Sequence, residues 1–253
     1  MKKIFLLSGL LSLLILNSVH ANEKWTEIGM YMFLTDIKGD TRIGNVVSDV
    51  DVPVSDVLDE LDMAFMAFVE HRNGKWSFIG DIFYANIGAK DTIARNNVTA
   101  VSVDVDVELK QLMLEGFVAY RVVDKRDGIT RFGVDLLGGL RYNKIETELG
   151  VQVSALGLTT AGSRNGDIDW TDAVVGVRTQ YSFGNGWGLS GWADIGDGQD
   201  SSSYQLIGLV NYTFKNKARV FGGYRKYNME YEDNSIALDL DYQGPILGVS
   251  FRF

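Results

Sequence analysis

The chain has 253 residues, a formal net charge of −9 and no cysteine. The acidic balance argues against a nucleic-acid partner, because phosphate backbones bind basic surfaces. Without cysteine, disulfide frameworks and thiolate metal sites are excluded, and the length permits a single all-β domain.

The start of the chain is typical of a secretory signal peptide. Lysines at positions 2 and 3 precede an apolar run over residues 4–16, and Val19-x-Ala21 follows as a cleavage pattern. A run of about thirteen residues is too short for a membrane helix, which needs about 20. We therefore expect residues 1–21 to be removed. No later stretch reaches the length of a spanning helix, so residues 22–253 could cross a membrane only as a closed β-barrel.

The rest of the chain contains segments that alternate between apolar and polar residues, as antiparallel strands do. We predict ten strands. Eight or twelve stay open as alternatives, because Val-rich alternation in residues 41–54 and 92–107 could add a hairpin. The predicted strands cover residues 25–37, 61–72, 76–88, 107–121, 130–148, 169–183, 187–196, 203–214, 218–232 and 236–253.

The predicted connections alternate between short and mostly long ones. Tight turns are predicted at residues 72–75, 124–128, 184–186 and 215–217, and long connections at residues 38–60, 89–106 and 149–168. Short turns on one rim and long loops on the other are typical of outer-membrane barrels, which place the turns in the periplasm and the loops outside the cell.

Each predicted strand has one apolar face and one polar face. In residues 130–148, Leu136 and Leu140 share a face, whereas Asp135 and Arg141 share the other. A water-soluble sandwich would turn its polar faces outward. We expect the opposite here, because the polar faces carry closely spaced charges of both signs. Aromatic residues near strand ends match the girdles of membrane barrels: Trp76, Tyr84, Tyr120, Tyr142, Tyr181, Phe183, Trp187, Tyr212, Phe214 and Phe253.

The first long connection contains a predicted helix. Residues 53–61 carry apolar side chains at positions 54, 57, 58 and 61, which is a helical spacing, and Ser55 or Asp56 can cap its start. We expect this helix to be a small lid packed on the barrel mouth, with a binding helix as the alternative.

The inward faces carry a set of charges. Alternate residues of a strand share a face, and on this basis the inward charges are Glu70, Asp81, Glu115, Asp135, Arg141, Asp172, Arg178, Asp194 and Arg225. Buried charges are costly when unpaired, whereas carboxylates and guanidinium groups paired across strands satisfy one another. Bulky inward residues join them: Phe83, Met113, Phe117 and Trp192. We therefore predict a salt-bridged, largely plugged lumen, and the alternative is a charged constriction in a solute channel.

No catalytic, cofactor-binding or metal site is predicted. His71 is the only histidine after residue 21, and it falls at the turn end of a strand, on the periplasmic rim. This position does not favour a hydrolase that relies on histidine. Residues 194–200 place acids three apart but lack the twelve-residue loop and closing Glu of an EF-hand, so we expect a solvated turn.

Apolar residues change parity within the last predicted strand. They are even-numbered from Ile236 to Tyr242 and odd-numbered from Pro245 onward. A β-bulge inserts one residue and switches the two faces, and Pro245 lacks an N–H for the ladder in any case. We therefore expect a bulge at residues 243–245.

The chain ends in an amphipathic strand with an aromatic last residue. The pattern Gly248-x-x-Phe251-x-Phe253 resembles the C-terminal assembly signal of bacterial outer-membrane barrels, although Ile246 stands where a polar residue is common. The resemblance implies the outer membrane of a Gram-negative bacterium as location, with barrel-assembly machinery and outer-membrane lipid as partners.

Several short motifs, taken in order, resemble an uncharacterised family of small proteobacterial outer-membrane β-barrel proteins. They are residues 53–62, Gly80-Asp81, Asp169-Trp170, residues 175–178, residues 223–225 and residues 244–253. This resemblance implies a fold and a location but no catalytic residues. We expect a non-enzymatic barrel with a structural or surface role. A porin-like small-solute channel is the second reading, and a barrel enzyme acting on lipid or peptide is the third.

Overall fold

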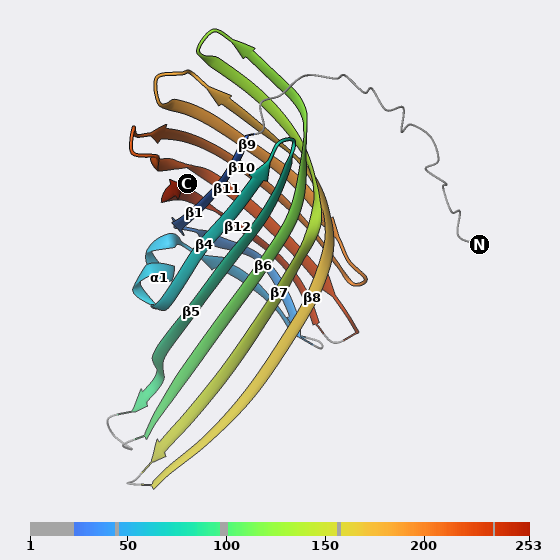
Figure 1. Cartoon of the computed structure of the whole chain (residues 1–253). Helices are drawn as coiled ribbons and strands as arrows, with labels where there is room; N and C mark the ends of the chain where they lie inside the picture. The colour runs from blue at the N-terminus through green and yellow to red at the C-terminus, as the bar shows by residue number, and fades with distance from the viewer. Residues whose placement is uncertain (1–22, 44–45, 97–100, 156–157, 235) are drawn as a thin grey trace, which may run out of the picture.

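A computed structural model describes residues 23–43, 46–96, 101–155, 158–234 and 236–253 (Figure 1). These residues form a closed antiparallel β-barrel of ten strands, in the order β1-β4-β5-β6-β7-β8-β9-β10-β11-β12, and β12 pairs back onto β1. The predicted fold class and strand number are confirmed. The expected signal peptide lies outside the described residues.

The ten barrel strands are β1 (Lys24–Phe33), β4 (Leu61–Asn73), β5 (Trp76–Asn96), β6 (Val101–Asp127), β7 (Thr130–Ala155), β8 (Leu158–Ser182), β9 (Trp187–Asp197), β10 (Ser201–Thr213), β11 (Ala218–Glu232) and β12 (Ile236–Arg252). Two further strands, β2 (Asp36–Ile43) and β3 (Val46–Val52), form a hairpin on the outer end of β12. A short helix, α1 (Val54–Asp59), leads into β4. No helix in the described part of the chain is long and apolar enough to cross a membrane.

An apolar belt surrounds the barrel. Outward side chains such as Leu140, Val175 and Leu247 are more than half exposed, and the alternation of each strand predicts this arrangement. At the inner rim, aromatic side chains pack on one another, and the ring centroids of Trp76 and Tyr120 are 4.7 Å apart. Toward the outer rim the outward positions become polar: Lys110, Lys144, Asp169, Lys226 and Asp241. The belt is therefore bounded on both sides, as a lipid-facing band must be.

Strands β5 to β8 continue far beyond this belt, as Figure 1 shows. They contain 21, 27, 26 and 25 residues, whereas β9 contains 11. About 9–11 residues are enough to cross a bilayer. The connections expected at residues 89–106 and 149–168 are therefore mostly strand, because their Val-rich alternation extends the hairpins instead of forming loops. The β7–β8 register runs unbroken from Arg131↔Ser182 to Ala155↔Leu158.

The prediction of a β-bulge at residues 243–245 was wrong. The register of β12 against β11 is continuous from Ala218↔Phe251 to Glu232↔Ala237. Even-numbered residues face inward along the whole strand, and Tyr242 and Ile246 are both buried. The parity of apolar residues changes because the surroundings change. Above the belt the outward side meets water, while the inward side packs in an apolar part of the lumen.

Candidate functional site

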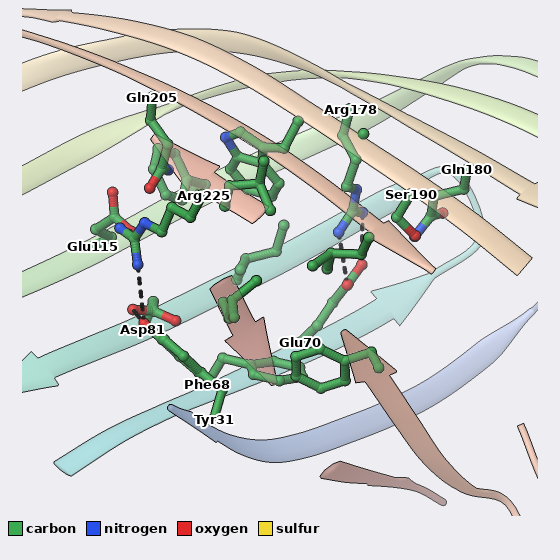
Figure 2. A pocket seen from close by; sticks show the side chains of 18 of the residues that line it. Tyr31, Phe68, Glu70, Asp81, Glu115, Arg178, Gln180, Ser190, Gln205 and Arg225 are labelled. Carbon is green, nitrogen blue, oxygen red and sulfur yellow. Dashed lines mark hydrogen bonds and ion pairs between the residues drawn. The ribbon is translucent and has the colours of Figure 1, made fainter. Parts of the chain in front are cut away.

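The inward charges form two connected clusters in the lumen. The inner cluster is centred on Asp135 of β7, which is buried and accepts hydrogen bonds from three arginines. Arg72 donates at 2.9 Å and Arg178 at 2.8 Å, and Arg121 also donates to this carboxylate. Arg178 is shared further, because its two terminal nitrogens donate to both oxygens of Glu70 at 2.8 Å each (Figure 2).

The middle cluster is centred on Arg141, which is fully buried. Its guanidinium donates to Glu115 at 2.6 Å, to Asp194 at 2.8 Å and to the hydroxyl of Ser203 at 2.9 Å. Ser203 in turn donates to Asp172 at 2.7 Å. These groups come from five successive strands, β6 to β10, so the cluster cross-links half of the barrel wall from inside.

Arg225 connects the middle cluster to β1. One of its terminal nitrogens is 3.8 Å from a carboxylate oxygen of Glu115, and the other donates to the hydroxyl of Tyr31 at 3.3 Å. Tyr31 donates onward to Asp81 at 2.8 Å. Figure 2 shows Arg225 directed toward this side of the lumen. All nine predicted lumen charges therefore lie in the barrel interior and belong to connected networks.

The sequence reasoning missed several members of these networks. Arg72 lies at the end of β4, yet it stands two residues after Glu70 and shares its face. Arg121 stands six residues after Glu115 and shares its inward face, but it was not included among the predicted lumen charges. Glu27 was missed as well. It is buried, and it accepts hydrogen bonds from Arg219 at 3.1 Å and from Arg252 at 2.6 Å.

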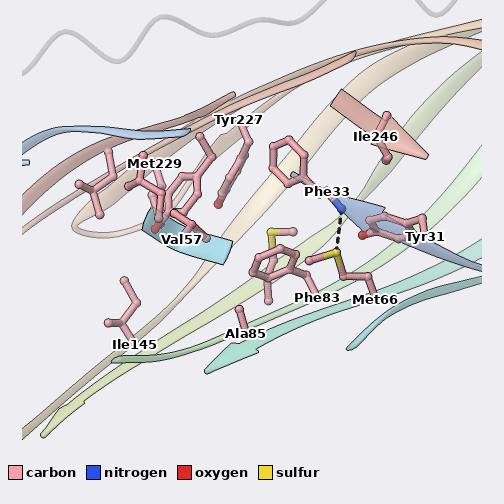
Figure 3. Packing of buried hydrophobic residues seen from close by; sticks show 14 of the residues in the cluster. Tyr31, Phe33, Val57, Met66, Phe83, Ala85, Ile145, Tyr227, Met229 and Ile246 are labelled. Carbon is pink, nitrogen blue, oxygen red and sulfur yellow. Dashed lines mark hydrogen bonds between the residues drawn. The ribbon is translucent and has the colours of Figure 1, made fainter. Parts of the chain in front are cut away.

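Above the charged clusters the lumen is apolar (Figure 3). The inward side chains at this level pack into one cluster that includes Phe33, Met66, Phe83 and Tyr242, and α1 adds Val57 to it. Figure 3 shows Val57 entering this cluster from the helix. The predicted lid is thus packed on the outer end of the lumen. At the inner end lies a vestibule of about 480 Å³, and its lining includes several arginines, among them Arg126.

A smaller cavity of about 150 Å³ lies at mid-height between the two clusters. Its lining includes Glu70, Asp81, Arg178 and Trp192. A water molecule occupies about 30 Å³ of liquid, so such a space holds about five waters. The cavity can therefore hold a few waters that hydrate the charged groups, or one molecule about the size of benzene.

The residues considered for chemistry are accounted for by structural contacts. His71 lies in β4 opposite Thr26, and its Nδ1 is 2.9 Å from the Thr26 hydroxyl. Asp194 is bound to Arg141, so it is not free to be a calcium ligand with the later acids of the 194–200 turn. Among the residues that the structure describes, no three His, Cys, Asp or Glu side chains are grouped so as to hold a metal ion.

The residues of the C-terminal pattern divide between the two faces of β12. Phe251 and Phe253 point outward and are about half exposed. Gly248 faces inward against the ring of Phe221, where a Cβ atom would lie 2.2 Å from a ring carbon. The glycine is therefore required by packing in the folded barrel, independently of any part in assembly.

No family model matches the chain, and a search of curated proteins found no significant match. Solved structures are similar in fold. The outer membrane protease OmpT from Escherichia coli is 11% identical, with 92% of this chain and 99% of that chain covered and a TM-score of 0.52.

Two further outer-membrane proteins align over most of their length with lower TM-scores. Ail, the attachment invasion locus protein of Yersinia pestis, is 13% identical, with 91% of this chain and 99% of that chain covered and a TM-score of 0.35. A Pseudomonas aeruginosa FadL homologue is 9% identical, with 91% of this chain and 90% of that chain covered and a TM-score of 0.32. Identities this low bear on the fold alone. With its closed barrel and apolar belt, the protein is a ten-stranded β-barrel of the bacterial outer membrane.

Proposed function

We propose that this protein is a non-enzymatic, non-conducting barrel whose plugged transmembrane part supports an extracellular sheet made from β5 to β8. We place it in the family of small proteobacterial outer-membrane barrels that its motifs resemble. The observation that carries the proposal is the position of Arg178. Its strand, β8, and the strand of Glu70, β4, are separated by three strands on one side of the barrel and by five on the other. The ion pair therefore spans the lumen.

Physical arguments support a closed lumen. Eight-stranded barrels are filled by side chains, and open aqueous channels are typical of about 16–18 strands. A permeating ion would have to separate pairs such as Arg141 with Glu115 and Asp194, whose partners are all buried, and then pass the apolar cluster above them. Moving an ion through such an apolar layer is costly because nothing there replaces its hydration.

The outer extension supports a surface role. In β8, five residues are exposed, and they lie on both faces of the strand: Gly162, Ser163, Asn165, Gly166 and Asp167. Strand residues that are exposed on both faces contribute little to a core. A long two-faced sheet held away from the membrane is suited to contact with other molecules at the cell surface.

Planar-bilayer recording with purified, refolded protein tests the plugged lumen. We expect no steady single-channel steps from the natural chain. A variant with Arg141→Gly, Arg178→Gly, Phe83→Ala and Tyr242→Ala shortens side chains in both charged clusters and in the apolar cluster above them. It serves as the positive control, because both barriers to small ions are then reduced. Reproducible steps from the natural chain, altered by Asp81→Asn or Arg178→Gln, would overturn the proposal in favour of a channel.

A small-solute channel is the second candidate, and one feature favours it. The periplasmic vestibule and the mid-height cavity share three lining residues, Gln180, Ser190 and Arg219. The two spaces are therefore adjacent, and together they extend about half-way up the lumen from the inner side. The bilayer experiment separates the candidates, because a path closed at its outer half carries no current.

A further inference from the structure

The β1–β4 junction of the barrel wall is open at its outer end. The two strands pair from Lys24↔Asn73 to Met30↔Ala67 and then diverge. On either side the wall stays intact, because β1 pairs with β12 as far as Phe33↔Ile246 and β4 pairs with β5 as far as Leu61↔Ile87. Residues 31–33 of β1 and 61–66 of β4 therefore border a gap, which we call the seam.

At the seam, one backbone N–H group forms a hydrogen bond with a side chain instead of with the neighbouring strand. The N–H of Phe33, which would face β4 in a regular ladder, donates to the Met66 sulfur at 3.2 Å (Figure 3). A thioether is a weak acceptor compared with a carbonyl. In a lipid environment an open ladder is tolerated only where protein covers it. The seam is thus a locally weakened part of the wall that side chains keep closed.

Helix α1 lies across the top of the seam. At its start, the Val54 N–H donates to the Asp36 carboxylate at 2.7 Å, which ties the helix to β2. After its end, the Glu60 carbonyl accepts from the Gly88 N–H at 2.9 Å, which ties it to β5. The helix therefore connects the two sides of the gap instead of sealing the wall along its length.

An apolar cavity of about 290 Å³ occupies the seam. Its lining includes lumen residues such as Phe83 and Tyr242, and also Met32, Met63 and Leu58, which are about half exposed on the outer side of the barrel. Met32 and Met63 stand at the outer end of the apolar belt. The cavity therefore leads from the outer-leaflet level of the membrane into the apolar part of the lumen. An apolar cavity of about 150 Å³ can already hold a benzene-sized molecule.

The rim of the cavity is acidic. Asp62 lines the cavity, and three further exposed acids stand close to it in the sequence: Asp56 and Asp59 in α1, and Glu60 directly after the helix. The bordering segments 31–37 and 53–66 contain no lysine, arginine or histidine. A cationic group is therefore attracted to the rim and an anionic one is repelled, with a strength that falls as salt is added.

We propose that the seam binds one hydrocarbon chain of a single-chain amphiphile with a cationic head, taken up sideways from the outer leaflet. The chain lies in the 290 Å³ cavity, where methionine side chains adapt to its shape. The head stays at the acidic rim beside α1. This site is separate from the plugged, charged part of the lumen, so it goes beyond the function proposed above and is compatible with a barrel that does not conduct.

Photolabelling of the refolded full chain in lipid nanodiscs tests the site. Three dodecyl probes carry a diazirine in the chain and differ in the head, which is trimethylammonium, maltoside or sulfate. Mass spectrometry locates the adducts. We expect the trimethylammonium probe to label Met32, Met63 and Leu58 saturably and about tenfold more than the belt residues Leu140 and Val175, and the sulfate probe to show no such excess.

Two variants keep the test falsifiable. Neutralising the four rim acids to Asn or Gln should bring trimethylammonium labelling down to the maltoside level, whereas Asp167→Asn with Asp169→Asn on distant β8 should change nothing. These residues are exposed, so folding is retained. Ala64→Trp, in the cavity lining, should lower seam labelling by all probes to the level at Leu140. Labelling of the seam no stronger than at Leu140, or equal labelling by all three heads, overturns the proposal.

Discussion

Arg178 and Glu70 are joined across the lumen by two parallel hydrogen bonds of 2.8 Å, although they lie 108 residues apart in the sequence. Both side chains are buried. The geometry is the bidentate one that gives arginine–carboxylate pairs their strength and direction. Because Arg178 also donates to Asp135, a single guanidinium holds β4, β7 and β8 at a fixed separation.

Arg178→Leu should lower the free energy of unfolding by about 3–5 kcal/mol, because Glu70 then loses both hydrogen bonds from Arg178 and keeps a longer ion pair with Arg72, at 3.6 Å. Denaturant unfolding in detergent micelles measures the change. Arg42→Leu is the control: it removes the largely exposed pair with Glu232, so its loss should be about 0–1 kcal/mol. Arg141 and Arg225 should behave like Arg178. Small losses for all three would show that the lumen is wet and that the plugged description is wrong.

The double variant Arg178→Leu with Glu70→Leu refines this prediction. Replacing both members of a buried pair with apolar groups is often close to neutral. We therefore expect the double variant to be more stable than Arg178→Leu alone. A double variant that is less stable than the single one would mean that the two residues act through other partners.

Phe251 and Phe253 should matter for assembly and not for stability. Both side chains face outward, so they make no lumen contacts. The double variant Phe251→Ala with Phe253→Ala should reduce the amount of folded protein in the outer membrane of expressing cells, while protein refolded in detergent unfolds close to the natural midpoint. Val249→Ala, at an equally exposed position, is the control. Normal insertion of the double variant would refute the assembly role.

Met66→Leu probes the seam from inside. The substitution keeps volume and apolarity but leaves the Phe33 N–H without its acceptor. We expect a loss of about 1 kcal/mol and faster hydrogen exchange at the Phe33 amide, since an unsatisfied buried donor costs about 1–3 kcal/mol and sulfur is a weak acceptor. Exchange at the paired amide of Val249 provides the reference. Unchanged exchange at Phe33 would show that the sulfur contact has no stabilising role.

The periplasmic end should respond to acid through Glu23. Partial burial alone would raise the pKa of this carboxyl, but the hydrogen bond and charge of Arg131, with a further contribution from Arg126, hold the pKa below its ordinary value. A lowered folded pKa means that the contribution to stability is complete above the unfolded pKa of about 4.3 and is lost as the pH falls through the folded pKa.

Hydrogen exchange in the β6–β7 turn, residues 124–131, measures this effect. After correction for intrinsic rates, protection of the turn should decrease at acidic pH in the natural chain. Glu23→Gln should show lower protection at neutral pH and a smaller change on acidification. An equal pH response in both proteins would assign the effect to another carboxylate.

Much of the lumen could be predicted because strand alternation is local. Whether Asp135 or Leu136 faces inward depends only on parity within β7, and the neighbouring strands obey the same rule. Pairing partners are different, because nothing in the sequence near Arg178 indicates that Glu70, four strands away, is its acceptor. Arg178 and Glu70 become partners only when the barrel closes, because closure sets the distance between β4 and β8.

The remaining errors share one cause. The parity change before Pro245 was interpreted as a bulge, but it marks the height at which β12 leaves the lipid. The seam was not predicted, because the alternation within β1 and within β4 does not indicate that their pairing ends at Met30↔Ala67. The alternation of apolar and polar residues in one strand shows which residues share a face. It does not show where along the strand the membrane ends, or where pairing with the neighbouring strand stops.

The contacts of Glu27 have a consequence for the order in which the barrel forms. This buried carboxylate joins the first strand to Ser250 and Arg252, 223 and 225 residues later in the chain, and Thr26 exchanges two backbone hydrogen bonds with Phe253. Contacts between such distant residues carry the largest entropic cost and close late. Until then β1 and β12 are two unprotected sheet edges, each able to pair with another chain. A chain that stops before β12 should therefore accumulate as mispaired oligomers. Chaperones and barrel-assembly machinery are needed most at this last step.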